Sequence, residues 1–291
     1  MIYFVMIVLL LSLCLTIRFG LFVPEKKDLT VLMYHKVSTS QKDALTVTTR
    51  QLEKQLQHLQ ALGYNTVTGK QAIDFIEKNE PLPPNPLLVT FDDGYVDTLE
   101  LAYPLLQQYQ VKATIFLPSA DIQQTNTANQ SVLSVEQLRT MDLNLVEFAL
   151  HTHTHCDFKK ASLKDMQHEL LENMRFFKEN ELPYAPVFAY PYGARPKHKA
   201  ALVDMKNLMN ELGVKMAFRI GNRINNLPLK DIYEVQRLDV RGTDSFWEFK
   251  TKLKKRKKYN VNWTIANMGK TLSLLNLNYS FLRKRSKPTF N

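Results

Sequence analysis

Residues 87–95 read Leu87-Leu88-Val89-Thr90-Phe91-Asp92-Asp93-Gly94-Tyr95, an apolar strand that runs directly into two carboxylates and a glycine. Carboxylates at the end of a buried strand are stable only where they are hydrated, hydrogen-bonded or bound to a cation. Asp-Gly between apolar residues is also a common hairpin signal. Residues 96–106, however, continue with helical spacing. The stretch therefore predicts the strand, turn and helix of an α/β protein, with its chemistry at the carboxyl end of the strand.

The rest of the chain repeats this alternation of strands and helices. Strand patterns recur at 29–35, 64–67, 113–117, 146–150, 187–190, 215–218 and 233–238. Helical spacing fills the gaps, at 49–62, 71–78, 105 onward, 163–178 and 199–212. The first of these helices is expected to begin at a threonine cap, Thr48 or Thr49, and to end at Gly63. Eight strands alternating with helices predict a parallel sheet closed into a barrel.

Composition points to a folded chain with a basic tail. The 291 residues are 45% hydrophobic, enough for one large domain or two small ones, and the formal net charge is +10. Much of the excess lies in 250–258 and near the end, at Arg283, Lys284, Arg285 and Lys287. Such runs are usually a solvated helix face or tail, with attraction to an anionic membrane as the second interpretation. No nucleic-acid partner is predicted.

The N-terminus has the pattern of a membrane anchor. Residues 1–17 carry no charged side chain, and the apolar run resumes after Arg18 as far as Val23. Residues 1–23 would span a bilayer if Arg18 snorkels. The chain has no basic n-region and no small-x-small cleavage site, so an uncleaved single-pass helix is predicted rather than a removable signal peptide. The positively charged residues that follow leave its orientation open. Cys14 and Cys156 do not form a disulfide pattern.

A cluster of histidines ends the strand at 146–150, in the order His151-Thr152-His153-Thr154-His155. Neutral imidazole is the commonest protein ligand for zinc and similar ions, and two histidines four residues apart can share one ion where the backbone turns. Together with the two aspartates at another strand end, they predict a metal site. One carboxylate and two histidines would leave coordination positions open, as catalysis requires, and the second aspartate would be free to act as a general base.

A third strand end carries turn residues, in the order Phe188-Ala189-Tyr190-Pro191-Tyr192-Gly193. Proline fixes the backbone and glycine permits a sharp bend, so a backbone N–H near Tyr192 could point at an oxyanion. Taken alone, Pro-Tyr-Gly is usually only a turn.

In order and spacing, these three stretches resemble the first three motifs of the polysaccharide deacetylases of carbohydrate esterase family 4, the NodB-homology domain, over about 29–255. The resemblance implies an α/β fold, a distorted (β/α)7 TIM-like barrel. It implies that Asp92 is the general base and that one divalent metal binds at Asp93, His151 and His155. Zinc is the expected ion, with cobalt, nickel, manganese or iron as alternatives. It also implies that Tyr192 supplies the oxyanion N–H, and that the sugar is lined by Tyr95, Pro191 and Tyr192. His153 matches the family's variable position and is not expected to be a ligand.

Two departures from the family pattern narrow the resemblance. Ala189 stands where the family often has an arginine that holds the catalytic aspartate, and no Leu-x-His motif occurs near 234–240. Both features, and the opening Leu32-Met33-Tyr34-His35-Lys36-Val37, are similar to the subgroup that acts on poly-β-1,6-N-acetylglucosamine. By that likeness His35 protonates the leaving amine; the alternative is that His35 only packs or hydrogen-bonds at the barrel rim. Arg237 is a candidate to orient Asp92.

The expected protein is a membrane-anchored hydrolase that removes N-acetyl groups from an amino-sugar polysaccharide of the cell envelope. Its expected parts are a transmembrane anchor over 1–23, a catalytic domain over 29–255 on the extracytoplasmic side, and a basic tail over 256–291. The alternatives are an O-acetyl esterase acting on a glycan, a glycan-binding barrel without catalysis, and a non-haem iron oxygenase, which uses the same ligand set.

Overall fold

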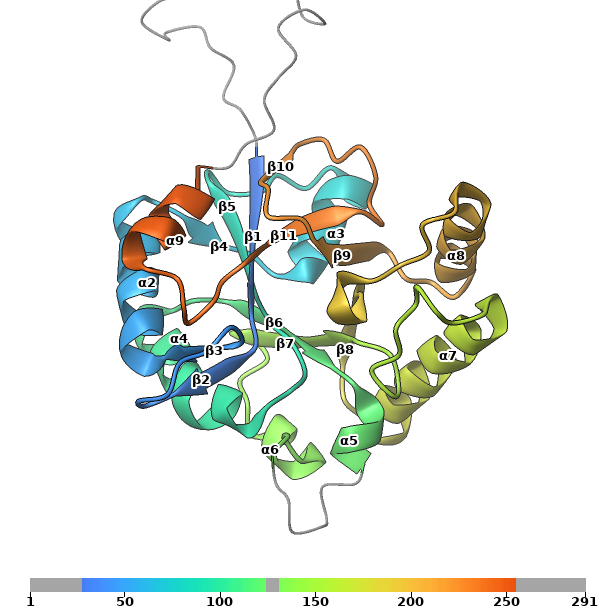
Figure 1. The fold of residues 1–291 in the computed structure, drawn as a ribbon, viewed down its shortest axis with the longest axis horizontal. Helices are drawn as coiled ribbons and strands as arrows, with labels where there is room; N and C mark the ends of the chain where they lie inside the picture. Colours follow the sequence, from blue (N-terminus) through green and yellow to red (C-terminus); the bar gives the residue numbers. More distant parts are fainter. Residues whose placement is uncertain (1–27, 124–130, 255–291) are drawn as a thin grey trace, which may run out of the picture. The chain divides into compact units, whose positions relative to one another are not determined.

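The computed structural model describes residues 28–123 and 131–254, and its centre is a closed ring of seven parallel strands (Figure 1). The ring consists of β1 (Asp28–Tyr34), β5 (Pro86–Phe91), β6 (Ala113–Leu117), β7 (Val146–Leu150), β8 (Tyr184–Ala189), β9 (Met216–Ile220) and β11 (Val235–Asp239). The strand order is β1-β11-β9-β8-β7-β6-β5, and a parallel pairing of β5 with β1 closes it. The predicted (β/α)7 barrel is confirmed.

The expectation of eight barrel strands is wrong, because the segment at 64–67 stays outside the ring. Only β4 (Asn65–Thr66) forms there, and it pairs with β5 alone. Thr68 already caps the next helix, so no longer strand can form. Another short strand, β10 (Asn225–Asn226), runs antiparallel to β1. A separate two-stranded sheet is made by β2 (Lys36–Ser38) and β3 (Thr46–Thr48).

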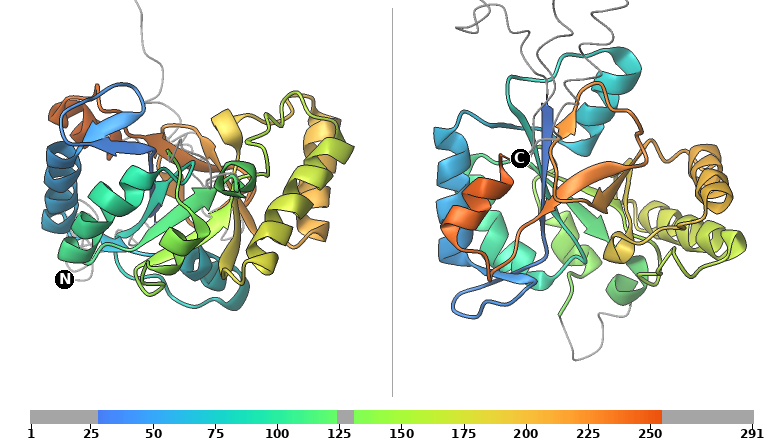
Figure 2. Two further views of the ribbon diagram at one scale, coloured as in Figure 1. Left: turned by 90° about the horizontal axis from the view of Figure 1, so that it is seen from below. Right: turned by 45° about the horizontal axis from the view of Figure 1, so that its top comes forward.

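Helices surround the ring, as the three views of the ribbon show (Figures 1 and 2). They are α2 (Thr49–Ala61), α3 (Gly69–Lys78), α4 (Tyr103–Tyr109), α5 (Ser119–Gln123), α6 (Val135–Arg139), α7 (Leu163–Glu179), α8 (Lys199–Glu211) and α9 (Phe246–Lys252). A capping box begins α2, α3, α6, α7 and α9, which explains why these helices start where they do. A short π-helix, η1 (Thr98–Ala102), precedes α4.

The core has two layers, and α3 closes one end of the barrel. One cluster of buried side chains takes alternate residues from all seven ring strands, such as Val31, Leu88 and Val187, and is therefore the barrel interior. Ala72 and Ile73 of α3 belong to the same cluster. The second cluster contains the intervening residues and the apolar faces of the helices. Since α3 fills the amino-terminal end of the barrel, only the carboxyl end is left for a site.

Alternation along the strands carries polar residues to that open end. Side chains of successive strand residues point to opposite faces, so residues two apart share a face. Inward-facing Leu88 is followed by Thr90 and then Asp92, and inward-facing Ala149 is followed by His151. Because inward-facing positions alternate along each strand, Asp92 and His151 lie at the barrel mouth, directly beyond the packed interior.

The predicted anchor over 1–23 lies outside the described residues, as does the predicted tail over 256–291. Among the helices that the structure describes, none has the length and apolar character that crossing a membrane requires.

Candidate active site

Three side chains from two strand ends meet at the barrel mouth. Oδ1 of Asp93 lies 3.3 Å from Nε2 of His151 and 3.2 Å from Nε2 of His155. Each of the three residues offers one ligand atom, and these atoms lie within 4.8 Å of one another. The two histidines meet because the backbone turns through the left-handed region at Thr152 (φ 65°) and His155 (φ 57°), as it also does at Asp93 (φ 71°).

The chemistry of this cluster fits a divalent cation. Nδ1 of His151 is 2.8 Å from the carbonyl oxygen of Ala189, which can only accept, so Nδ1 carries the proton and Nε2 presents a lone pair. Asp93 Oδ1 is buried and accepts no well-directed hydrogen bond from the described residues, although both imidazoles face it. Acceptor atoms that face one another this closely need a cation between them, and two imidazoles with one carboxylate are suitable metal ligands.

The second aspartate, Asp92, is held by an arginine of β11, which only β1 separates from β5 in the ring. Nη1 and Nη2 of Arg237 donate to the two carboxylate oxygens of Asp92 at 2.6 Å and 2.7 Å, and both side chains are buried. Burial by itself raises the pKa of Asp92, but the Arg237 charge outweighs burial and holds this pKa below its ordinary value. Asp92 is therefore ionised and fixed in orientation. Arg237 thus makes the contact with Asp92 that its expected role in orienting this residue requires.

His35 also lies at this mouth. Its Nε2 is 3.9 Å from Oδ2 of Asp92, and its Nδ1 is buried without a hydrogen-bond partner among the described residues. Since His35 directly follows β1, which neighbours β5 in the ring, it stands beside Asp92 for a topological reason. The imidazole is thus near the reacting groups and is not anchored by a hydrogen bond at Nδ1.

The Pro-Tyr-Gly turn forms the short helix η2 (Pro191–Gly193) next to the histidines. Tyr192 adopts φ 58°, its side chain is 68% exposed, and its ring centroid lies 4.6 Å from that of His155. Pro191 is buried below it. A Cβ at Gly193 would lie 2.9 Å from Cγ1 of Ile220, so only glycine lets this turn approach β9. The turn places an exposed aromatic ring and a backbone bend beside the metal cluster.

Tyr95 connects the rim to the cluster. Its side chain hydrogen-bonds Asp93, and burial together with the Asp93 charge raises the pKa of Tyr95, so its hydroxyl stays a donor. Nζ of Lys36 lies 4.3 Å from the centroid of the Tyr95 ring. Contact of Tyr95, Pro191 and Tyr192 with a sugar stays a prediction.

The structure also brings together residues near the site that no sequence motif identified. Glu234 binds Arg195, with Nη2 to Oε2 at 2.6 Å, and Oε2 of Glu234 lies 2.7 Å from Nε of Arg219, which ties the chain after η2 to the neighbouring barrel wall. On α7, Glu169 and Asn173 are buried and bind the histidine loop. The sequence pattern could have indicated these two residues, because they are polar side chains on a helix face that is otherwise mostly apolar.

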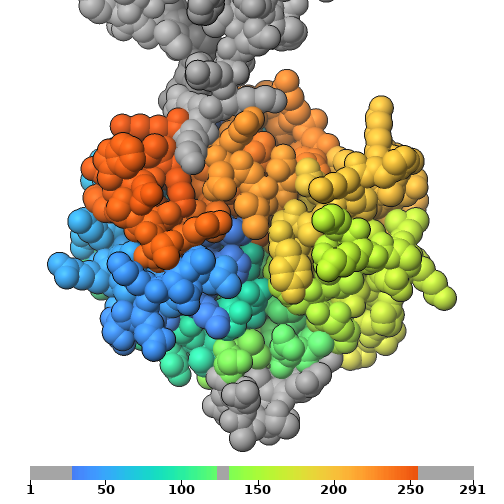
Figure 3. Space-filling model, viewed as in Figure 1, coloured from blue at the N-terminus to red at the C-terminus, as the bar shows by residue number. Residues whose placement is uncertain are grey.

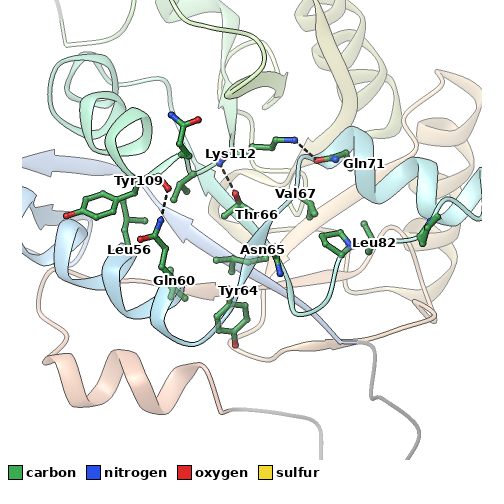
Figure 4. A pocket seen from close by; sticks show the side chains of 16 residues that line it. Leu56, Gln60, Tyr64, Asn65, Thr66, Val67, Gln71, Leu82, Tyr109 and Lys112 are labelled. Atoms are coloured by element: carbon green, nitrogen blue, oxygen red, sulfur yellow. Dashed lines mark hydrogen bonds between the residues drawn. The ribbon is translucent and has the colours of Figure 1, made fainter.

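A cavity of about 640 Å³ lies away from this cluster, between α2, β4 and the end of α4 (Figure 4). Its polar groups are paired with one another: Nε2 of Gln60 donates to the carbonyl of Tyr109 at 2.8 Å, and the backbone N–H of Lys112 donates to Thr66 Oγ1 at 2.9 Å. None of the residues that line it belongs to the metal cluster. The reactive groups gather at the mouth instead, where early, middle and late parts of the chain meet on one face (Figure 3).

Known proteins resemble this chain in sequence. Residues 79–217 match the family model described as polysaccharide deacetylase. The poly-beta-1,6-N-acetyl-D-glucosamine N-deacetylase of Staphylococcus epidermidis is 27% identical over 247 residues, covering 76% of this chain and 82% of that protein. The protein YxkH of Bacillus subtilis is 29% identical over 165 residues, and this match spans only 57% of the length of YxkH.

Solved structures share the fold. The Streptococcus pyogenes deacetylase PplD superposes with a TM-score of 0.68 at 20% identity, covering 78% of this chain and 98% of PplD. IcaB from Ammonifex degensii gives a TM-score of 0.62 at 24% identity, covering 74% and 93% of the two chains.

The fold and the site together define the class: an α/β barrel with a cluster that could hold a divalent metal. More particularly, the chain resembles the polysaccharide deacetylase family, whose model matches the part from the end of α3 to β9.

Proposed function

We propose that the chain removes N-acetyl groups from a polymer of N-acetylglucosamine, with Asp92 as general base and a divalent metal at Asp93, His151 and His155. The observation that carries this proposal is the position of an ionised, arginine-held carboxylate directly beside the metal cluster. The name of the Staphylococcus epidermidis relative, an N-deacetylase of poly-β-1,6-N-acetylglucosamine, supports the choice of substrate class.

The proposed reaction divides the work between the metal and the side chains. A divalent ion in the cluster would acidify a water molecule and polarise the acetyl carbonyl. Asp92 accepts the proton of the attacking water, and Arg237 keeps its carboxylate ionised and fixed in orientation. A nitrogen and oxygen donor set with open positions suits zinc, and we propose zinc as the native ion, with cobalt, nickel, manganese or iron as alternatives.

The neighbouring residues would act on the charges that develop during the reaction. The backbone N–H of Tyr192 is proposed to stabilise the oxyanion, while the exposed Tyr192 ring, with Tyr95 and Pro191, lines the sugar site. His35 is proposed to donate a proton to the departing amine, because its Nε2 lies 3.9 Å from Asp92 and an imidazole can act as a general acid.

The test is acetate release by zinc-loaded protein from three substrates: β-1,6-linked N-acetylglucosamine oligomers, β-1,4-linked oligomers and acetylated xylan. We expect release from the first, and its loss in Asp92→Asn. The matched control is Asp204→Asn, which makes the same change at an exposed position on α8. Release from xylan alone would identify an O-acetyl esterase. Binding of the oligomers without any release would identify a glycan-binding barrel.

Two further measurements complete this test. Activity with zinc in the absence of oxygen separates hydrolysis from the chemistry of a non-haem iron oxygenase, which needs a redox-active metal and oxygen. Anchoring of the chain in a membrane by residues 1–23, with the barrel on the extracytoplasmic side, stays a proposal. Membrane fractionation and protease accessibility of the full chain in cells test it.

A further inference from the structure

Two polar side chains on α7 interrupt an otherwise mostly apolar buried stripe. Glu169 is 7% exposed and Asn173 is fully buried, whereas other members of the stripe, such as Leu170 and Phe177, are apolar. Glu169 and Asn173 are four residues apart, so they lie on the same helix face one turn apart. A buried carboxylate and a buried amide are costly unless their hydrogen bonds are made, so their partners indicate what they are for.

Both side chains bind the loop that joins the two histidine ligands. Oε2 of Glu169 accepts from the backbone N–H groups of His153 and Thr154 at 2.8 Å and 2.7 Å, and Oε1 accepts from Thr154 Oγ1 at 2.7 Å. Oδ1 of Asn173 accepts from the backbone N–H of His151 at 3.0 Å.

Asn173 also fixes the position of α7 against the barrel. Its Nδ2 donates to the carbonyl of Leu117, the last residue of β6, at 3.0 Å. Asn173 therefore binds both the last carbonyl of β6 and the backbone N–H of His151, the first residue after β7. These two bonds hold α7 in one position against the barrel, and from this position Glu169 reaches the loop.

The loop needs such support because its backbone is strained. Thr152 and His155 both have positive φ, a conformation that is uncommon outside glycine and least favourable for the β-branched Thr152. Strained conformations persist only where surrounding contacts determine them. Without the contacts from α7, relaxation of either residue would redirect the His155 imidazole and separate it from His151, to which its ring centroid now lies at 4.9 Å.

We propose that Glu169 and Asn173 are positioning residues that shape the 151–155 loop before metal arrives. They act through the backbone and touch neither metal nor substrate. This inference rests on the metal site of the proposed function, and it adds that metal affinity is set in part by a helix outside the ligand set. Loss of an outer partner of a metal ligand typically weakens metal binding 10- to 100-fold.

Zinc affinity of metal-free protein, measured by competition with a chelating dye, tests the proposal. Glu169→Ala is expected to weaken zinc binding about 10- to 100-fold. Glu169→Gln is expected to stay within about threefold of wild type, because the amide oxygen accepts both N–H groups while its NH₂ donates to Thr154 Oγ1. The control Glu179→Ala removes an exposed carboxylate from the same helix and should leave affinity unchanged.

A readout independent of metal is amide hydrogen exchange in the metal-free protein. The amides of His153 and Thr154 should exchange faster in Glu169→Ala than in wild type or Glu179→Ala. If Glu169→Ala does not fold, Thr154→Val removes one of the three bonds and should weaken zinc binding about fivefold.

Wild-type zinc affinity in Glu169→Ala would overturn the proposal, as would wild-type affinity in Thr154→Val where that variant stands in. Equal losses in Glu169→Gln and Glu169→Ala would also overturn it, because charge rather than loop shape would then be responsible. Zinc binding without acetate release by wild type would reject the proposed function and leave this inference intact. Absence of zinc binding by wild type would reject both.

Discussion

The two ends of the barrel differ in whether their buried polar groups have hydrogen-bond partners. At the amino end, Glu147 of β7 accepts from the backbone N–H groups of Gly69 and Lys70 and from Thr114 Oγ1, so its oxygens are satisfied by the helix that closes the barrel. At the carboxyl end, Asp93 Oδ1 and His35 Nδ1 are buried without a hydrogen-bond partner among the described residues. Buried polar atoms without partners are costly, so their presence beside the metal cluster points to a ligand there.

Titration separates the two ends as well. Burial raises the pKa of Glu147 despite its three hydrogen bonds. Burial also acts to raise the pKa of Asp93, but the two histidines outweigh it and the net shift is downward. A carboxylate beside cationic or metal-binding groups is stabilised in its charged form, whereas one that only caps a helix is not stabilised enough to offset its burial. The carboxyl end of the barrel therefore holds the reactive groups, whereas the buried carboxylate at the amino end only holds a helix in place.

Removing a ligand at the carboxyl end should have the largest effect. His151→Ala takes away one of the three donors and leaves Asp93 facing a single imidazole. We expect zinc binding to weaken by more than about 100-fold, beyond the range for outer partners, and acetate release to fall to background. Zinc content and turnover of the purified variant measure this. His198→Ala, at an exposed position before α8, is the matched control. Full zinc occupancy in His151→Ala would refute the assigned ligand set.

His35→Ala tests whether the unpaired imidazole takes part in the reaction. If His35 protonates the leaving amine, kcat should fall about 10²- to 10⁴-fold while zinc content stays at the wild-type level. The same His198→Ala control applies. Unchanged turnover would show that His35 only packs at the rim.

Arg237→Met separates orientation of the base from metal binding. It leaves Asp92 buried without its partner, which should lower the free energy of unfolding by about 3–5 kcal/mol. Because Arg237 holds the pKa of Asp92 down, the acidic limb of the pH–activity profile should move to higher pH in this variant. In wild type, the stability contributed by the ion pair is present above the ordinary pKa of an aspartate and is lost as pH falls. Thermal unfolding and kcat against pH measure both effects, with Arg175→Met on α7 as control. An unmoved acidic limb would contradict the role of Arg237.

The sequence could predict what is encoded locally. The strand ends at Asp92 and His151 each lie within a few consecutive residues, so their patterns identified the cluster. A helical turn was expected to bring the two histidines together, whereas the backbone passes through the left-handed region at Thr152 and His155. Closure of the ring by β1 and β5 and exclusion of β4 depend on long-range register, which a strand pattern does not contain. The bond from Arg237 to Asp92 joins residues 145 positions apart and could only be guessed. Glu169 was missed because its role depends on which loop α7 covers.

Glu147→Gln should have the smallest effect, and it tests the closed end of the barrel. The N–H of Gly69 and the hydroxyl of Thr114 share Oε1, whereas the N–H of Lys70 binds Oε2, so the single amide oxygen of glutamine can accept from only one of the two N–H groups of α3. Because this change lies at the end of the barrel away from the metal cluster, kcat should stay within about twofold of wild type. Because the pKa of Glu147 is raised in the folded state, its contribution to stability is full at low pH and falls as pH rises through the folded pKa.

The glutamine variant should remove that pH dependence and, at neutral pH, be less stable than wild type by about 1 kcal/mol, because one N–H group of α3 then lacks an acceptor. Glu147→Ala is the informative partner, since it leaves two N–H groups and a hydroxyl without an acceptor and should cost about 1–3 kcal/mol of unfolding free energy with turnover retained. Chemical denaturation at several pH values, together with acetate release, measures both variants. A loss of turnover in Glu147→Gln comparable to that of His35→Ala would mean that the two ends are coupled, and the division between a reactive end and a packed end would fail.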